Sequence, residues 1–283
     1  MADRDGLNDA VKTVAALRGE GGCPWDRAQT HTSLRKYLLE ETYETLEALD
    51  ALAGGPTPER VRHFKEELGD LLLQVLLHSE IARQNGDFSI QDVAGELSDK
   101  LVRRHPHVFG GARLDSAEEV VGAWEKNKQA EKPGRESVLE GIPAALPALQ
   151  RSLKVIEKVS KVGFQWPDLK GPFEKMREEL GEFEAEVSKA GGASLTRTAA
   201  GALPAETRRK LEGELGDLLF TVANVAHFLQ LNPEDSLRSM LARFESRFRS
   251  VEGGARAAGR KLEEMSLAEM DVLWDEAKKR ERG

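Results

Sequence analysis

Apolar side chains recur at intervals of three and four residues along almost the whole chain, with polar side chains between them. Two stripes are especially regular: Leu68, Leu71, Leu72, Val75 and Leu76 in one, and Leu215, Leu218, Leu219, Val222, Val225 and Ala226 in the other. This spacing places the apolar groups on one face of an amphipathic α-helix. Strand-like runs of Val, Ile, Thr and aromatic residues are few. The pattern therefore predicts an all-α protein.

An acidic motif stands beside each stripe and occurs twice. The first copy reads Glu40-Glu41-Thr42-Tyr43-Glu44 and then Glu67-Leu68-Gly69-Asp70, and the second reads Glu178-Glu179-Leu180-Gly181-Glu182 and then Glu214-Leu215-Gly216-Asp217. Carboxylates three residues apart share one helix face. If the two helices of a copy pack together, four carboxylates meet, and they repel one another unless a cation lies among them. All-oxygen ligands suit a hard ion such as Mg²⁺, so we predict a divalent cation site in each copy.

The duplication extends beyond the acids. Ser116 and Ser266 each begin a capping-box pattern, with Trp124 and Trp274 eight residues later. The pair Lys100 and Arg104 corresponds to the pair Arg243 and Arg247. Such an internal repeat predicts a tandem pair of helical-bundle domains, at 1–130 and 149–283, joined by a linker at 131–148 that contains Pro and Gly.

The two copies also differ. Lys175 stands three residues before Glu178, whereas Tyr37 occupies the matching place in the first copy. The connection from Glu182 to Glu214 is 32 positions long, against 23 in the first copy, and its Gly-rich composition predicts a flexible excursion. Because it lacks the lysine, the first copy is expected to be a weaker or silent metal site.

Composition narrows the function. The chain has 283 residues and a net charge of −8, so we expect no basic surface for duplex nucleic acid. One cysteine, Cys23, excludes an internal disulfide and a thiolate zinc site. No signal peptide is recognisable, and no run approaches the ~20 apolar residues of a membrane span. We expect a cytoplasmic protein.

Metal-assisted hydrolysis of a nucleotide fits these groups best, since metal-held carboxylates can orient or acidify a water at a phosphate. Four cations are candidates for the phosphate charge, and Trp274 offers a flat face to a base; the cations are Lys175, Lys210, Arg243 and Arg247.

Other classes fit less well. A di-iron helical oxidase needs Glu-x-x-His pairs, and no histidine here has a glutamate three residues before it. The spacing at Arg177-Glu178-Glu179 does not match a Nudix box. The rival function that stays open is a catalytically silent helical dimer that binds nucleotide or a protein partner as a regulator.

The ordered motifs together resemble the MazG family of nucleoside triphosphate pyrophosphohydrolases. Besides the two acidic sets, they are Gly22-Cys23-Pro24-Trp25-Asp26, Arg103-Arg104-His105-Pro106-His107-Val108-Phe109, Val162-Gly163-Phe164-Gln165-Trp166 and Arg243-Phe244-Glu245-Ser246-Arg247. The resemblance covers nearly the whole chain. It implies Mg²⁺-dependent hydrolysis of nucleoside triphosphates to monophosphate and pyrophosphate, nucleotide-pool sanitation, and a homodimer of tandem helical domains whose second domain is the active one.

Carried onto this sequence residue by residue, the resemblance implies a metal site and a nucleotide site. The implied metal ligands are Glu179, Glu182, Glu214 and Asp217, with Glu41, Glu44, Glu67 and Asp70 as the weaker second set. The implied nucleotide contacts are Lys175, Glu178, Lys210, Arg243, Arg247, Trp274 and Lys278, and Glu178 joins the metal ligands as a catalytic candidate. Gly213 departs from the family pattern, in which an acidic residue often stands before the Glu-x-x-Asp motif.

Overall fold

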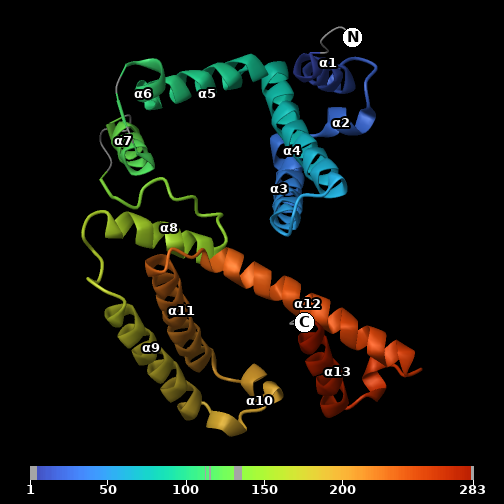
Figure 1. Cartoon of the computed structure of the whole chain (residues 1–283), viewed down its shortest axis with the longest axis vertical. Helices are drawn as coiled ribbons and strands as arrows, with labels where there is room; N and C mark the ends of the chain where they lie inside the picture. Colours follow the sequence, from blue (N-terminus) through green and yellow to red (C-terminus); the bar gives the residue numbers. More distant parts are fainter. Residues whose placement is uncertain (1–4, 112, 115, 131–135, 282–283) are drawn as a thin grey trace. The chain divides into compact units, whose positions relative to one another are not determined.

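The computed structural model describes residues 5–111, 113–114, 116–130 and 136–281. Regular secondary structure in these ranges is entirely helical, which confirms the all-α prediction (Figure 1). The fold divides into two compact units, Met1–Pro133 and Gly134–Gly283, called the first and second unit below. Residues 131–135 of the predicted linker lie outside the described ranges, and none of the described helices combines the length and apolarity that a bilayer span requires.

The first unit is built around a long helical hairpin. Its helices are α1 (Gly6–Arg18), α2 (Pro24–Ala28), α3 (His31–Ala53), α4 (Pro58–Asn85), α5 (Ile90–Arg104), α6 (Pro106–Phe109) and α7 (Ala117–Ala130). Helices α3 and α4 pack along each other, and α1 lies against α4 (Figure 1). The buried core of this hairpin consists of Val14, Leu34, Leu76, Leu77 and Ile81. Burial of this core fixes which faces of α3 and α4 turn inward, whereas Leu68, Leu72 and Val75 of the predicted apolar stripe remain exposed.

Local sequence sets the ends of the hairpin helices. Thr30 caps α3 by accepting a hydrogen bond from the Ser33 amide at 3.1 Å. Thr57 caps α4, and Pro58 follows at the first helical position, where its missing N–H costs nothing. Helix α4 ends at Gly86, whose φ of 81° is the left-handed conformation that favours glycine.

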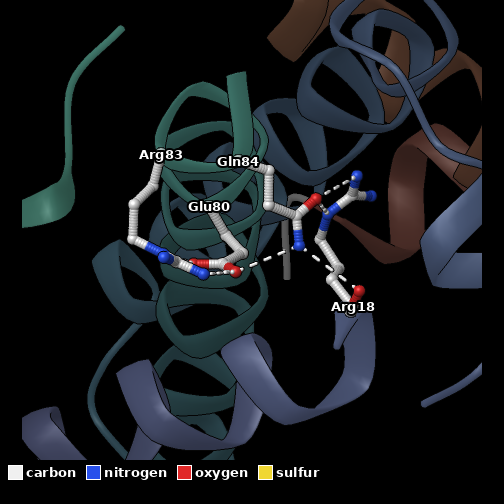
Figure 2. A network of polar contacts seen from close by, with 4 residues as sticks. All are labelled: Arg18, Glu80, Arg83 and Gln84. Carbon is white, nitrogen blue, oxygen red and sulfur yellow. Dashed lines mark hydrogen bonds and ion pairs between the residues drawn. The ribbon is translucent and has the colours of Figure 1, made fainter. Parts of the chain in front are cut away.

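A buried polar network fastens α1 and α2 to the carboxyl-terminal end of α4 (Figure 2). Arg18 donates from Nη2 to Gln84 Oε1 at 3.1 Å and from Nη1 to the backbone carbonyls of Asp26 and Gln29. Gln84 Nε2 donates to Glu80 Oε1 at 3.1 Å, and Arg83 Nη2 donates to the same carboxylate at 2.7 Å. Since Arg18 and Glu80 are both buried, each depends on these partners to compensate for lost hydration.

This network makes the first unit sensitive to acid. The hydrogen bonds from Arg83 hold the pKa of Glu80 below its ordinary value, with Gln84 and Arg18 adding to the effect. A carboxyl whose pKa is lowered by folding stabilises the fold above its unfolded pKa, and this contribution disappears as the pH falls through the folded pKa. We expect Glu80→Gln to cost about 1–3 kcal/mol at pH 7 and to flatten the loss of stability below pH 4.5.

Hydrogen exchange of the α4 amides, measured at several pH values, tests this expectation. The matched control is Glu47→Gln at an exposed position of α3, which should leave both protection and its pH dependence unchanged. Equal protection in wild type and Glu80→Gln at neutral pH would show that the network contributes nothing to stability.

The second unit repeats the hairpin. Its helices are α8 (Ala148–Ser160), α9 (Lys170–Lys189), η1 (Gly192–Ser194), α10 (Arg197–Gly201), α11 (Ala205–Phe228), α12 (Pro233–Ala257), η2 (Leu262–Glu264) and α13 (Leu267–Arg280). Helices α12 and α13 carry the arginine and tryptophan that correspond to Arg104 on α5 and Trp124 on α7. Helix α9 packs along α11, α8 lies against both α11 and α12, and α12 packs on α13 (Figure 1). Most of its buried apolar side chains are contributed by α8, α11, α12 and α13: Leu153, Ile156, Ala223, Val251, Ala255 and Ala277.

Two sequence predictions about this unit can be compared with the structure. The capping box at Ser266 is confirmed, since its hydroxyl and the Glu269 side chain each bond to the other residue's amide. The connection between α9 and α11, for which the sequence predicts a flexible excursion, carries two short helices. It contains η1 and α10, and α10 begins at a capping threonine, Thr196, which accepts from the Ala199 amide at 3.2 Å.

Candidate active site

Three carboxylates meet between α9 and α11 in the second unit. Glu179 and Glu182 come from α9 and Glu214 from α11, and one oxygen from each lies within 4.8 Å of the others. Glu179 is buried, whereas Glu182 is exposed at the rim. The i, i+3 spacing places the two α9 acids on the face that packs on α11, which is why the helix pairing brings Glu214 to them.

Lys175 is the counter-charge of this cluster. Its Nζ lies 2.7 Å from Glu179 Oε1 and 2.8 Å from Glu178 Oε1. These two bonds raise the pKa of the lysine, so its ammonium stays charged. Burial, followed by the charges of Glu179 and Glu214, raises the pKa of Glu182, and Lys175 opposes that rise. The negative charges of the three carboxylates thus lie close together, and Lys175 balances only part of them.

One implied metal ligand, Asp217, and the implied catalytic and nucleotide contact Glu178 lie outside this cluster. Asp217 is exposed and does not belong to the group of three, although it follows Glu214 by one helical turn. Glu178 is exposed and is held by Lys175. Lys210 lies one turn before Glu214 on α11 and forms an ion pair with Glu206 at 3.4 Å.

The remaining implied nucleotide contacts lie on α12 and α13. Arg247 Nη2 donates to Glu281 Oε2 at 2.7 Å, and its guanidinium lies 5.8 Å from the centre of the Trp274 ring. Trp274 also packs against Phe244, with ring centres 4.9 Å apart. The pKa of Glu281 is lowered first by Arg247, with a further contribution from Arg243, which places both arginines near one carboxylate. Lys278 Nζ lies 3.4 Å from Asp275.

The first unit contains the same two arrangements. Carboxylate oxygens of Glu41, Glu67 and Asp70 lie within 4.8 Å of one another, while Glu44 hydrogen-bonds to Glu41 outside that group. The Arg104 guanidinium lies 5.1 Å from the centre of the Trp124 ring, as Arg247 does over Trp274. Burial first, then the charges of Asp70, Glu44 and Glu67, raise the pKa of Glu41.

Two residues on or next to the helices that carry these sites are not among the sequence candidates. Glu281, the partner of Arg247, lies 34 residues from it in sequence, and no local pattern connects the two. Gln74 is buried on α4, one turn beyond Asp70, and its Oε1 has no hydrogen-bond partner among the described atoms. The spacing of Glu67, Asp70 and Gln74 on one helix face is the signal by which Gln74 can be recognised.

The donor chemistry of both clusters fits a hard divalent cation. All the gathered atoms are carboxylate oxygens, and the described residues contribute neither imidazole nor thiolate to either group. Mg²⁺ is commonly bound through one or two protein carboxylates, with water and substrate phosphates completing its shell. A cluster open at one side therefore suits a metal that also contacts a phosphorylated substrate.

Comparison with known proteins places these clusters within a recognised sequence family. Residues 29–109 match the family model described as the MazG nucleotide pyrophosphohydrolase domain, a span that includes the first carboxylate cluster. The nucleoside triphosphate pyrophosphohydrolase/pyrophosphatase MazG of Thermotoga maritima is 40% identical over 273 residues, covering 96% of this chain and 95% of that protein. The nucleoside triphosphate pyrophosphohydrolase of Escherichia coli K12 is 36% identical, covering 93% of this chain and 92% of that protein. A Mycobacterium tuberculosis protein of the same name is 45% identical over 159 residues, covering 56% of this chain and 46% of that protein.

Proposed function

This chain belongs to the MazG family, and from that membership we propose that it hydrolyses nucleoside triphosphates to nucleoside monophosphates and pyrophosphate. One observation carries the proposal: three carboxylates and one lysine ammonium converge between α9 and α11. This arrangement supplies metal ligands and a phosphate-binding cation at one place. Its near-full-length relatives from Thermotoga and Escherichia coli are named for this activity.

We assign Mg²⁺ to Glu179, Glu182 and Glu214, and we propose Asp217, one turn further along α11 but outside the gathered group, as a fourth ligand. The bound ion would neutralise phosphate oxygens and lower the pKa of a bound water. Glu179 is the buried anchor of the set, because burial and its bond to Lys175 hold its carboxylate in one orientation. Glu182 on α9 and Glu214 on α11 would hold the ion from both helices of the pair.

Lys175 and Glu178 act beside the metal ligands in this scheme. The ammonium of Lys175 exchanges a carboxylate contact for a phosphate oxygen when the triphosphate binds, and so stabilises its charge. Glu178 lies outside the three-carboxylate group, so it is the carboxylate we assign to accept a proton from the attacking water. We assign Lys210, one turn before Glu214 on α11, to contact the outer phosphates.

The nucleoside end of the substrate is assigned to α12 and α13. Trp274 presents a ring beside Arg247, which suits stacking on a base together with contact to an oxygen of sugar or phosphate. Arg243 and Lys278 add positive charge to the same pair of helices. Glu281 Oε2 accepts hydrogen bonds from both Nε and Nη2 of Arg247, and Glu281 is the anion that a phosphate would displace.

Replacing Arg247 should affect binding more than chemistry. We expect Arg247→Gln to raise KM about 10–100-fold with a much smaller change in kcat, because one charge-assisted contact of about 1.5–3 kcal/mol is lost. Steady-state kinetics with several nucleoside triphosphates check this. Arg249→Gln, at an exposed position of the same helix, is the matched control. A fall in kcat at unchanged KM would show that Arg247 acts in the chemical step and not in substrate binding.

Product identification tests the activity itself. Nucleoside triphosphate with Mg²⁺ should give monophosphate and pyrophosphate in equal amounts, separated by ion-exchange chromatography. Appearance of diphosphate and inorganic phosphate would contradict the proposed bond cleavage. Tight nucleotide binding with no release of either product would favour the rival function, a silent helical regulator.

We further propose that the working form is a homodimer. Large apolar side chains are exposed on α11 and α12 and would be covered by a second copy of the chain: Leu215, Leu219, Phe220, Val222, Leu237, Met240, Leu241, Phe244 and Phe248. Light scattering after size exclusion should give twice the chain mass of 31.2 kDa. A monomer at micromolar concentration would contradict the assignment.

The proposed biological role is nucleotide-pool sanitation in the cytoplasm. Hydrolysis to a monophosphate and pyrophosphate converts a triphosphate into products that polymerases cannot incorporate, which suits disposal of unwanted nucleotides. Cells that lack the protein should accumulate non-standard triphosphates, as measured by mass spectrometry of nucleotide extracts. Unchanged pools under nucleotide-damaging stress would argue against this role.

A further inference from the structure

One carboxylate lies among the cations that we assign to the nucleoside end of the substrate. Glu281 Oε2 accepts a hydrogen bond from Arg247 Nε at 2.9 Å and another from Arg247 Nη2 at 2.7 Å. The pKa of Glu281 is lowered first by its bond to Arg247 and further by the charge of Arg243, one helical turn earlier on α12. A carboxylate offers an arginine the same kind of anionic oxygen as a phosphate does. Glu281 therefore occupies the arginine in the way that a nucleotide phosphate would.

The two partners of this ion pair are not held equally firmly. Arg247 lies well inside α12, its side chain is 24% exposed, and its guanidinium lies 5.8 Å from the centre of the Trp274 ring. Glu281 directly follows Arg280, the last residue of α13, and its side chain is 36% exposed. The last residues of a helix open more readily than its interior. The carboxylate is therefore the partner that can move away while the arginine stays in place.

The neighbouring acids on both helices have cations of their own. Asp275 on α13 lies 3.4 Å from the Lys278 ammonium, and Glu245 on α12 lies 3.3 Å from the Arg249 guanidinium. Among the described residues, the carboxylate that hydrogen-bonds to Arg247 is that of Glu281 alone. Displacement of this one side chain is thus enough to free the arginine.

Helical spacing explains why the ring and the carboxylate reach the same arginine. Glu281 follows Trp274 by seven residues, which is about two helical turns, so both lie on the face of α13 that packs on α12. The same interval recurs in the first copy, where Glu131 follows Trp124 by seven residues, although Glu131 lies outside the described residues. The glutamate is therefore part of the repeated sequence pattern together with the tryptophan.

We propose that Glu281 is an internal competitor for the nucleotide: it occupies Arg247 in the empty site and is displaced by the phosphate next to the sugar. The inference rests on the proposed function, because it takes Arg247 as a nucleotide contact. A site that is competent in only a fraction of the molecules binds its ligand more weakly by that fraction. Nucleoside mono- and triphosphates should therefore lose affinity by a similar factor.

This competition matters most for the product. The triphosphate also meets the metal ligands and Lys175 between α9 and α11, so it displaces Glu281 and still binds. The monophosphate left after cleavage has lost its outer phosphates and depends on α12 and α13. Return of Glu281 to Arg247 then favours release of the monophosphate. Pyrophosphate, assigned to the cluster between α9 and α11, does not compete with Glu281.

Calorimetric binding of the four ribonucleoside monophosphates to the full chain tests the proposal. We expect Glu281→Gln to tighten this binding about 3–10-fold, the modest factor of a partly exposed ion pair, and to lower the KM for triphosphates similarly. Binding of pyrophosphate with Mg²⁺ should not change. Glu276→Gln, at an exposed position of the same helix, is the matched control and should leave all three constants unchanged. Equal or weaker monophosphate binding in Glu281→Gln would overturn the proposal.

A double substitution separates competition from the simple loss of a negative charge. In a protein that already carries Arg247→Gln, the further change Glu281→Gln should no longer tighten monophosphate binding, because the group for which the two anions compete is gone. Circular dichroism verifies that each variant is folded. A gain in affinity that persists in the double variant would refute competition and assign the effect to charge at a distance.

The same measurements distinguish a failure of this inference from a failure of the proposed function. If the wild-type protein neither binds a nucleotide nor hydrolyses a triphosphate, the proposed function is wrong, and the role of Glu281 falls with it. If the wild-type protein hydrolyses triphosphates and Glu281→Gln leaves every constant unchanged, only the role given to Glu281 is wrong.

Discussion

Glu179→Gln is expected to abolish nearly all pyrophosphate release, with a loss of about 10³-fold or more in kcat/KM. The side chain is buried between α9 and α11, lies in the three-carboxylate group, and bonds Lys175 at 2.7 Å. One substitution thus removes the charge of a proposed metal ligand and loosens the cation proposed to bind phosphate. Metal ions contribute several kcal/mol to stabilising phosphoryl-transfer charge, and each 1.36 kcal/mol corresponds to a factor of ten in rate.

Two variants define what this result means. Glu174→Gln lies on the same helix at an exposed position, paired only with Lys170 in the described contacts, and should retain full activity. Glu41→Gln, in the first cluster, should reduce activity much less than Glu179→Gln. The family model matches residues 29–109, which include the first cluster but not the second. Comparing Glu41→Gln with Glu179→Gln is therefore a strict test of which unit carries the activity. Equal losses in Glu41→Gln and Glu179→Gln would contradict the assignment of the working site to the second unit.

Removal of divalent cations is expected to have the other large effect. Treatment with EDTA should lower hydrolysis to background, and Mg²⁺ or Mn²⁺ in excess should restore it. The donors in both clusters are all oxygens, and without a cation the carboxylates would repel the negatively charged triphosphate. Ca²⁺ should restore binding but little turnover, because its longer and more flexible coordination misplaces the reacting groups.

Controls distinguish a catalytic metal from a structural one. Far-ultraviolet circular dichroism of the EDTA-treated protein should show its helices intact, because the described cores of both units are apolar. Nucleotide binding, followed by tryptophan fluorescence, should weaken together with activity. Full hydrolysis in EDTA would exclude the proposed mechanism, and unfolding in EDTA would assign the ion a structural role instead.

The helices of this protein were largely predictable because their signals are local. The apolar stripe around Leu72 and its counterpart around Leu219 lie on α4 and α11, and the capping box at Ser266 begins α13. The two Glu-x-x-Glu pairs on α3 and α9 were expected to share one helix face, since this follows from 3.6 residues per turn. The short helices η1 and α10 were missed, because glycine-rich composition indicates a turn without indicating where one helical turn will form.

Part of the candidate site depends on contacts between helices and could not be predicted from the amino-acid sequence. Which acids meet depends on the register of α9 against α11, and that register gathers Glu214 while leaving Asp217 exposed outside the group. The pairing of Arg247 with Glu281 spans 34 residues and arises from the packing of α12 on α13. The unsatisfied oxygen of Gln74 exists only because the surrounding helices exclude water and offer no donor.

The sequence by itself determined the helical fold class, the duplication and the residue types that carry the chemistry, because periodicity and spacing act over a few residues. Tertiary structure alone decided which carboxylates converge, which ammonium or arginine each one meets, and which polar atom is left unpaired. Those outcomes depend on side-chain distances of a few ångströms across packed helices. Such distances are set by the burial of apolar faces contributed from distant parts of the chain.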